Sequence, residues 1–225
     1  IFAIAFGYVE SAVVVYLRKL YYPNGFEFPL VAIPDLMAFT ELGREAATIV
    51  MLVTIGLIMG RSGLEKFAYF LYCFAVWDIF YYIWLKVILG WPTSLMTWDI
   101  LFLIPVPWVG PVIVPLIASL TMVLLTFLII HIKAHWTWAR VKSWEWVGLI
   151  GGSLIFILAC AWDYCRFVVE NYGWGQLWTL DKEAVFAMTK HYTPEYFNWP
   201  LFFLAEAIIL LVIGTFAWRY LKRGR

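Results

Sequence analysis

Carboxyl side chains occur in segments of this chain that are otherwise as apolar as the interior of a membrane. Asp78 is the clearest case, because it interrupts the aromatic stretch 74–84. A charged carboxylate at the centre of a bilayer costs about 2.5 kcal/mol or more, so it requires a partner, a proton, a cation or a path to water. The sequence therefore predicts that Asp78 serves proton or cation chemistry, or an interhelical contact.

Similar charges recur near one end of five of the six apolar segments. Exposing a carboxylate to lipid is the costliest arrangement, so we expect these side chains to converge on the axis of a helix bundle. The predicted proton or cation cluster comprises Glu10, Glu45, Asp78, Asp163 and Glu206, and its predicted charge partners are Arg18, Arg44, Lys86 and Arg166. The opposite halves of the segments, such as 50–58 and 149–158, are plain apolar sequence.

The acids in this zone outnumber the bases. Eight acids face the four bases named above: Glu10, Glu41, Glu45, Asp78, Asp99, Asp163, Glu170 and Glu206. Surplus carboxylates do not remain ionised in a dry interior, so some must hold a proton, bind a cation or meet water. Carboxyl groups of this kind are typical of a proton relay or a cation site. The alternative is that the carboxyl groups form interhelical ion pairs and hydrogen bonds that hold the bundle together.

The composition indicates an integral membrane protein. Apolar residues make up 64% of the chain and charged residues 14%, and the mean hydropathy is +0.84. With about 20 apolar residues needed per crossing, hydropathy predicts an all-α bundle in a single domain over residues 1–225. The six predicted spans are residues 1–18, 42–60, 65–89, 111–133, 145–169 and 200–220.

Basic residues predict the orientation of the bundle. With six spans, the two short loops and both termini share one side, which should be cytoplasmic because it carries the excess of lysine and arginine. These residues are Arg61, Lys66, Lys133, Arg140, Lys142, Lys222, Arg223 and Arg225. The chain begins at Ile1 without an initiator methionine, so we expect further sequence to have preceded it.

The connection from residue 90 to 115 is apolar but holds five of the ten prolines. Proline removes backbone donors and breaks helices, so the sequence predicts a re-entrant or interfacial segment packed on protein. Two roles are compatible with it: an aromatic anchor at the level of the head groups, or the lining of a pore or pocket. A further short amphipathic helix is predicted at residues 181–188.

Metal and nucleic-acid chemistry have little support in the sequence. His131 and His135 are spaced i, i+4, a geometry that can place two imidazoles on one metal or haem. Trp136 and Trp138 follow at once, which favours interfacial histidines, so no metal site is predicted. A near-neutral net charge of +1 and the absence of any phosphate-binding motif argue against nucleic acid.

Three segments resemble those of uncharacterised bacterial multi-pass membrane proteins. They are residues 41–47, 77–86 and 98–111, and two of them open on the dipeptide Trp-Asp, which also occurs at 162–163. The resemblance covers about half of the chain. It implies a bacterial inner membrane and brings with it no activity, cofactor or site.

Two functions from different classes follow. The first is a non-catalytic subunit of a larger, energy-transducing membrane complex that packs on lipids and other membrane proteins, since aromatic, apolar faces are abundant and no catalytic motif is present. The second is a self-contained small transporter or lipid-modifying enzyme that acts at the acidic cluster. The sequence requires no cofactor, and a bound lipid, quinone or pigment is compatible with either hypothesis.

Overall fold

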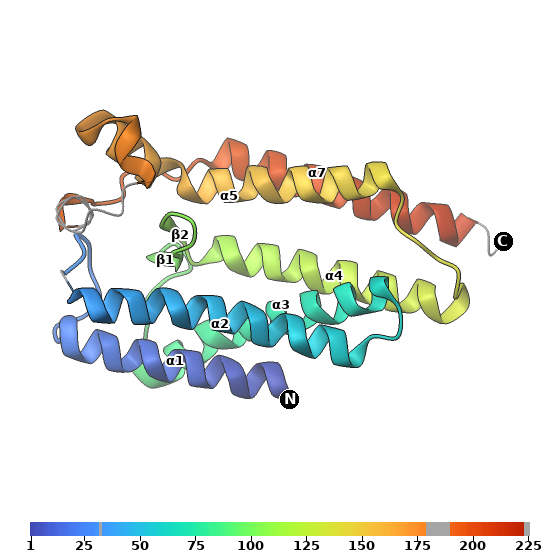
Figure 1. Ribbon diagram of the computed structural model, residues 1–225, viewed down its shortest axis with the longest axis horizontal. Helices are drawn as coiled ribbons and strands as arrows, with labels where there is room; N and C mark the ends of the chain where they lie inside the picture. Colours follow the sequence, from blue (N-terminus) through green and yellow to red (C-terminus); the bar gives the residue numbers. More distant parts are fainter. Residues whose placement is uncertain (32, 179–189, 223–225) are drawn as a thin grey trace.

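The computed structural model describes residues 1–31, 33–178 and 190–222, which form an all-α bundle with a small β-hairpin at one end (Figure 1). The predicted helix at 181–188 lies outside these residues. The elements are α1 (Phe2–Tyr21), α2 (Asp35–Met59), α3 (Gly63–Leu89), β1 (Trp98–Phe102), β2 (Trp108–Pro111), α4 (Ile113–His135), α5 (Ser143–Tyr172), the 3₁₀ helix η1 (Trp174–Trp178) and α7 (Trp199–Leu221). The predicted helical membrane bundle is confirmed.

Five of these helices are long and apolar enough to cross a membrane, namely α2, α3, α4, α5 and α7. They match five of the predicted spans to within a few residues, except that α2 begins at Asp35, seven residues before the predicted start. The predicted first span, 1–18, is not among them. Its helix α1 carries Glu10, Arg18 and Lys19 within 20 residues, which reduces its apolar length.

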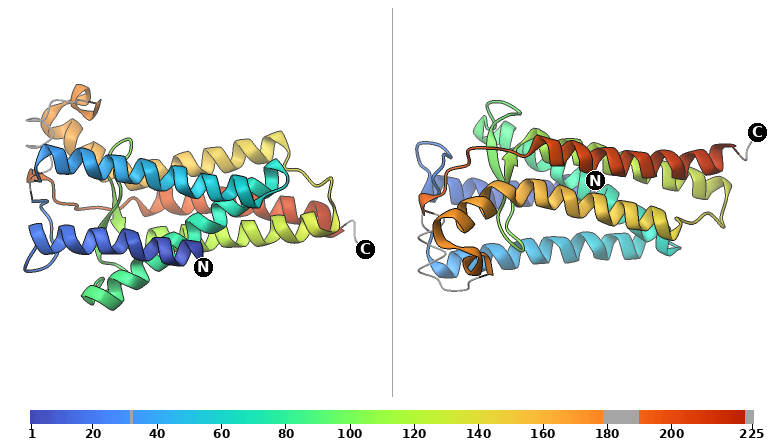
Figure 2. Two further views of the ribbon diagram at one scale, coloured as in Figure 1. Left: turned by 60° about the horizontal axis from the view of Figure 1, so that its bottom comes forward. Right: turned by 90° about the horizontal axis from the view of Figure 1, so that it is seen from above.

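The helices form a continuous chain of packed neighbours. α3 packs against α1, α2 and α4, while α5 and α7 form an antiparallel pair that joins the rest through α4 (Figures 1 and 2). Small residues allow the close approaches. A Cβ added at Gly56 would lie 2.7 Å from the backbone oxygen of Lys66, so α2 and α3 are in backbone contact there. Such packing matters in lipid, where burial of apolar area between helices has little driving force.

The two ends of the bundle are used below as landmarks. The hairpin end contains β1, β2 and the C-terminus of α3, and the opposite end contains the C-terminus of α7 (Figure 1). At the opposite end, apolar side chains of α4, α5 and α7 form a buried core that includes Ile129, Ile132, Val212 and Phe216.

The proline-rich segment forms the hairpin instead of a helix. β1 and β2 pair antiparallel, with Asp99 opposite Gly110 and a register shift between Ile100 and Phe102. Strand pairing satisfies backbone polar groups that a membrane environment leaves without water. β2 packs on α5, and Phe197 covers Gly110 so closely that a Cβ there would lie 2.9 Å from its ring. The hairpin therefore fills the space between α5 and the α1–α3 group.

Candidate functional site

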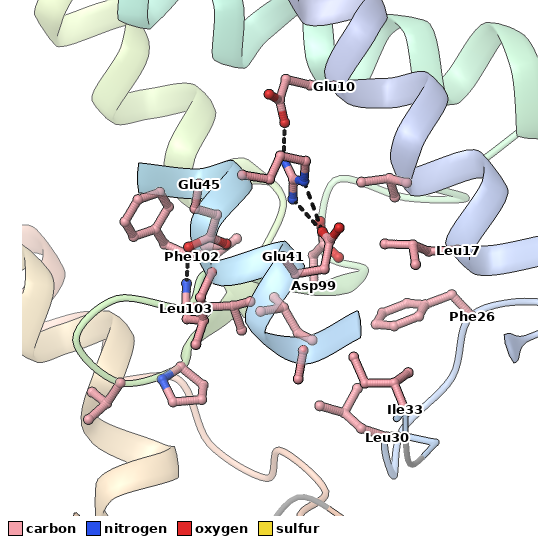
Figure 3. A pocket seen from close by; sticks show the side chains of 18 of the residues that line it. Glu10, Leu17, Phe26, Leu30, Ile33, Glu41, Glu45, Asp99, Phe102 and Leu103 are labelled. Carbon is pink, nitrogen blue, oxygen red and sulfur yellow. Dashed lines mark hydrogen bonds and ion pairs between the residues drawn. The ribbon is translucent and has the colours of Figure 1, made fainter. Parts of the chain in front are cut away.

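A cavity of about 490 Å³ lies at the hairpin end, between α1, α2, α3 and the hairpin. Figure 3 draws the carboxyl groups of Glu10, Glu41 and Glu45 above the apolar side chains of Phe26, Leu30 and Ile33. We call the side of the cavity with these carboxyl groups its floor, and the remaining lining its wall. We call this space the hairpin-end cavity. The charged side chains that line it are Glu10, Arg18, Asp35, Glu41, Arg44, Glu45, Asp78 and Asp99, six acids and two bases among the described residues.

Arg44 organises the floor of the cavity. Its guanidinium forms ion pairs with Glu10 of α1 and with Glu41 one turn earlier on α2, the latter at 2.8 Å. Thr48, one turn later, donates to Glu10 Oε1 at 2.6 Å. The helical spacing of residues 41, 44 and 48 places all three on one face of α2. This network therefore ties α2 to α1 through Glu10, which is 3% exposed.

Arg18 and Asp99 form a second network on the cavity wall. Arg18 Nη2 lies 3.1 Å from Asp99 Oδ1, and Tyr82 donates its hydroxyl hydrogen to Asp99 Oδ2 at 3.2 Å. The Arg18 guanidinium also lies between two rings, 3.7 Å from the centroid of Trp91 and 4.5 Å from that of Phe26. Burial raises the pKa of Asp99 to about 6, although Arg18 and the Tyr82 hydrogen bond act in the opposite direction. This network therefore connects α1, α3 and the hairpin.

Glu45 and Asp78 differ from Glu10, Glu41 and Asp99, because their described hydrogen bonds come from neutral donors and no ion pair accompanies them. Glu45 Oε2 accepts from the backbone N–H of Leu103 at 3.0 Å, and Asp78 Oδ2 accepts from the Ser119 hydroxyl at 2.8 Å. Within the part of the chain that the structure describes, neither carboxyl group forms an ion pair. They are the cavity groups that a proton or a cation would meet.

Three of the five predicted acids share the cavity, and two lie elsewhere. Glu10, Glu45 and Asp78 line it. Asp163 instead accepts from the Tyr192 hydroxyl at 2.9 Å and from the backbone N–H groups of residues 195 and 196, so it holds the segment before α7. Glu206 accepts from Thr121 at 2.8 Å and joins α7 to α4. The expected convergence of all five on one axis is therefore only partial.

The predicted charge partners divide in the same way. Arg18 and Arg44 belong to the cavity. Lys86 donates to the backbone oxygens of Gly90 and Pro92, at 3.1 and 2.8 Å, and so closes the end of α3. Arg166 pairs with Glu170 on the same helix at 2.8 Å, with more than half of each side chain exposed. Neither lines the cavity.

The histidine pair lies near the opposite end of the bundle. His135 Nδ1 is 2.9 Å from the backbone oxygen of His131, and the two rings are 4.7 Å apart. Over the described ranges, no three His, Cys, Asp or Glu side chains are grouped so that they could hold a metal ion.

Sequence reasoning did not single out a third buried charge network. Glu145 at the start of α5 is completely buried, and its carboxylate accepts from Arg219 near the end of α7 at 2.7 Å and from the Lys142 backbone N–H at 2.6 Å. This pair lies at the end opposite the cavity, so the buried charges do not all share one depth. Because Glu145 opens one apolar span and Arg219 closes the next, an antiparallel pairing of the two spans would have predicted the contact.

Three charged residues of the cavity lie outside the predicted set, namely Asp35, Glu41 and Asp99. Glu41 and Asp99 were counted in the acid surplus, yet a hydropathy profile places Asp99 in a loop.

A comparison of the chain with protein-family models, with curated proteins and with solved structures finds no match in any of the three. The function must therefore be argued from the cavity itself.

Proposed function

We propose that this chain is a self-contained membrane protein that binds an amphiphilic molecule in the hairpin-end cavity and handles a proton or a cation at its polar head. One observation carries the proposal: a single chain encloses a cavity with an apolar wall and a charged floor. The apolar wall includes Leu17, Phe26, Leu30, Ile33 and Phe102, and the floor holds the Arg44 network with Glu45 and Asp78. Binding sites for small molecules generally combine these two kinds of surface.

The charge distribution supports chemistry at the floor over simple cohesion. Arg18 and Arg44 are already engaged by Asp99, Glu10 and Glu41. Glu45 and Asp78 are two further acids of the cavity, and neither forms an ion pair with these two bases. A carboxyl group in such surroundings is stabilised by a proton or by a cation brought by a ligand. We assign proton or cation handling to Glu45 and Asp78.

The alternative function, a non-catalytic subunit of an energy-transducing complex, stays a prediction. The five apolar helices support contact with membrane lipid. An inner-membrane location with both termini cytoplasmic stays a prediction, and it requires α1 to cross the membrane together with these five helices. The cavity favours a protein that binds a small molecule, because it combines a charged floor with an apolar wall.

A cavity-filling variant tests the proposal. Leu17→Trp places a larger side chain in the cavity wall, whereas Tyr16→Trp changes the neighbouring residue, which is 66% exposed and does not line the cavity. Each protein is purified in maltoside detergent from native membranes, and bound amphiphiles are identified by native mass spectrometry and extraction. We expect a bound amphiphile on the wild type and on Tyr16→Trp, and its loss from Leu17→Trp.

The same measurement can contradict the proposal. If the wild type carries no amphiphile and takes up none on incubation with a total lipid extract, the cavity is not a binding site. Equal occupancy of both variants would place any bound amphiphile outside the cavity. Unfolding of each variant is followed by circular dichroism, so that a loss of binding is compared only between folded proteins.

A further inference from the structure

The cavity also constrains the chemistry of the head group that it binds. We infer that the polar head carries a positively charged nitrogen together with an oxygen acceptor, as in an amino alcohol. This inference rests on the proposed function and specifies its ligand class. It follows from two observations: the carboxyl groups on the floor that form no ion pair with described residues, and the buried hydrogen-bond donors without a partner on two residues that line the cavity.

The carboxyl groups select the charge of the head. Six acids and two bases line the cavity among the described residues, and both bases already form ion pairs with cavity acids. Glu45 on α2 and Asp78 on α3 retain carboxylate oxygens for a ligand. The floor therefore favours a cation and disfavours a phosphate or a carboxylate, which would meet like charges.

The aromatic wall is compatible with the same charge. Trp77, Tyr81 and Tyr82 lie along α3 beside Asp78 and line the cavity. Aromatic ring faces attract organic cations, and the effect increases when water is excluded. An ammonium nitrogen near Asp78 would thus meet ring faces as well as a carboxylate.

Two buried N–H donors of cavity residues lack an acceptor over the described ranges, and an oxygen atom of the head group would supply it. Arg18 lines the cavity and is 7% exposed, and its Nη1 has no hydrogen-bond partner within the described part of the chain. Trp77 also lines the cavity, and its Nε1 is likewise buried and has no hydrogen-bond partner among the described residues. Buried donors without an acceptor destabilise a structure, so a ligand oxygen that reaches them when neighbouring side chains move aside gains affinity. A head group with only a positive charge would leave these donors unused.

Four radiolabelled probes with the same ten-carbon chain test the inference on the purified full chain in maltoside detergent. They are N-decylethanolamine, decylamine, decanol and decanoate, measured as saturable binding at neutral pH with detergent-only blanks. We expect N-decylethanolamine to bind most tightly, decylamine next, and decanol about tenfold more weakly than decylamine, with decanoate the weakest.

Variants assign the two preferences to their residues. The double variant Glu45→Gln, Asp78→Asn should remove the preference for decylamine over decanol. Trp77→Phe, which keeps an aromatic ring and removes the N–H, should reduce the preference for N-decylethanolamine over decylamine. Glu170→Gln, an exposed acid on α5 outside the cavity, is the matched control and should change neither.

The possible failures are distinguishable. Saturable binding of all four probes with equal affinity, or tightest binding of decanoate, would overturn the head-group inference and leave the proposed function standing. Equal affinities for N-decylethanolamine and decylamine would overturn the role of the oxygen. Absence of saturable binding for every probe would overturn the proposed function as well. The order of wild-type affinities decides these outcomes even if a variant fails to fold.

Discussion

The two ends of the bundle bury charge in different ways. At the end opposite the hairpin, Glu145 is fully buried and meets Arg219, one acid for one base, and the backbone N–H of Lys142 adds a further bond. Apolar residues of α4, α5 and α7 surround this pair. At the hairpin end, six acids and two bases line an open volume of about 490 Å³.

We propose that this difference reflects a structural role at one end and ligand binding at the other. A balanced, closely packed pair such as Glu145 and Arg219 fixes the position of α5 against α7. Arg219 Nε lacks a hydrogen-bond partner among the described residues, but neither side chain lines the cavity. A surplus of acids beside an open volume lacks that balance, and its unpaired members Glu45 and Asp78 have capacity for a ligand. The following predictions test whether the two ends differ in this way.

The largest effect is expected at the balanced pair. Arg219→Leu leaves the buried Glu145 carboxylate without its cation, which should lower the free energy of unfolding by about 3–5 kcal/mol. Thermal unfolding in maltoside detergent measures the loss. Replacing both residues with leucine should recover much of it, because no buried charge is then left unpaired.

The exposed pair on α5 provides the control for this variant. Arg166→Leu breaks the pair with Glu170, in which both side chains are more than half exposed, and should cost no more than about 1 kcal/mol. Similar losses for Arg219→Leu and Arg166→Leu would contradict a structural role of the buried pair.

A smaller, pH-dependent effect is expected at Asp99 on the cavity wall. Burial raises its pKa from 3.8 to about 6, so the folded protein retains a proton between these pH values that the unfolded chain releases. The contribution of Asp99 to stability therefore falls as the pH rises through this window, and is constant above it. We expect wild-type protein to lose stability relative to Asp99→Asn between about pH 4 and pH 6, by a few °C in the unfolding midpoint.

The two proteins are compared by how much their unfolding midpoints change with pH. Their absolute midpoints also differ because Asp99→Asn removes the ion pair with Arg18. Titrating groups far from Asp99 contribute equally to both proteins. Parallel pH profiles would show that the pKa of Asp99 is the same in the folded and unfolded states, and a wild type that gains stability relative to the variant as the pH rises would show that folding lowers it. Either result would contradict the prediction.

The smallest effect on stability is expected at the unpaired cavity acids. Glu45→Gln and Asp78→Asn each keep an oxygen that accepts from the Leu103 N–H or from the Ser119 hydroxyl. Each should change the free energy of unfolding by less than about 1 kcal/mol in the thermal assay. A loss as large as that of Arg219→Leu would mean that Glu45 and Asp78 hold the helices together, and the two ends of the bundle would then be alike.

Hydropathy predicted most of the fold, because a membrane span requires a long apolar stretch whatever its neighbours are. It located α3 and α4 to within two residues at each end and marked the connection from 90 to 115 as too broken by prolines to span the membrane. It counted α1 as a span, although Glu10, Arg18 and Lys19 leave that helix outside the group of five. Strand pairing between residues 98–102 and 108–111 was not predicted.

The candidate site was predicted less completely, because a sequence shows which helix carries a charge and not which neighbour the charge faces. Asp78, Asp99 and Asp163 each follow a tryptophan, yet they bond respectively to Ser119, to Arg18 with Tyr82, and to the segment before α7. Similar local sequence therefore gives three different environments.

The sequence by itself determined that the chain lies in a membrane, where its helices run, and that its acids exceed its bases near one end. These properties depend on the cost of placing each side chain in lipid, which is local and additive. Only the tertiary structure decided which acids share a cavity, because contacts such as that of Glu10 with Arg44 join residues far apart in the chain. Their distances depend on how the helices pack, and the packing reflects the whole set of contacts at once.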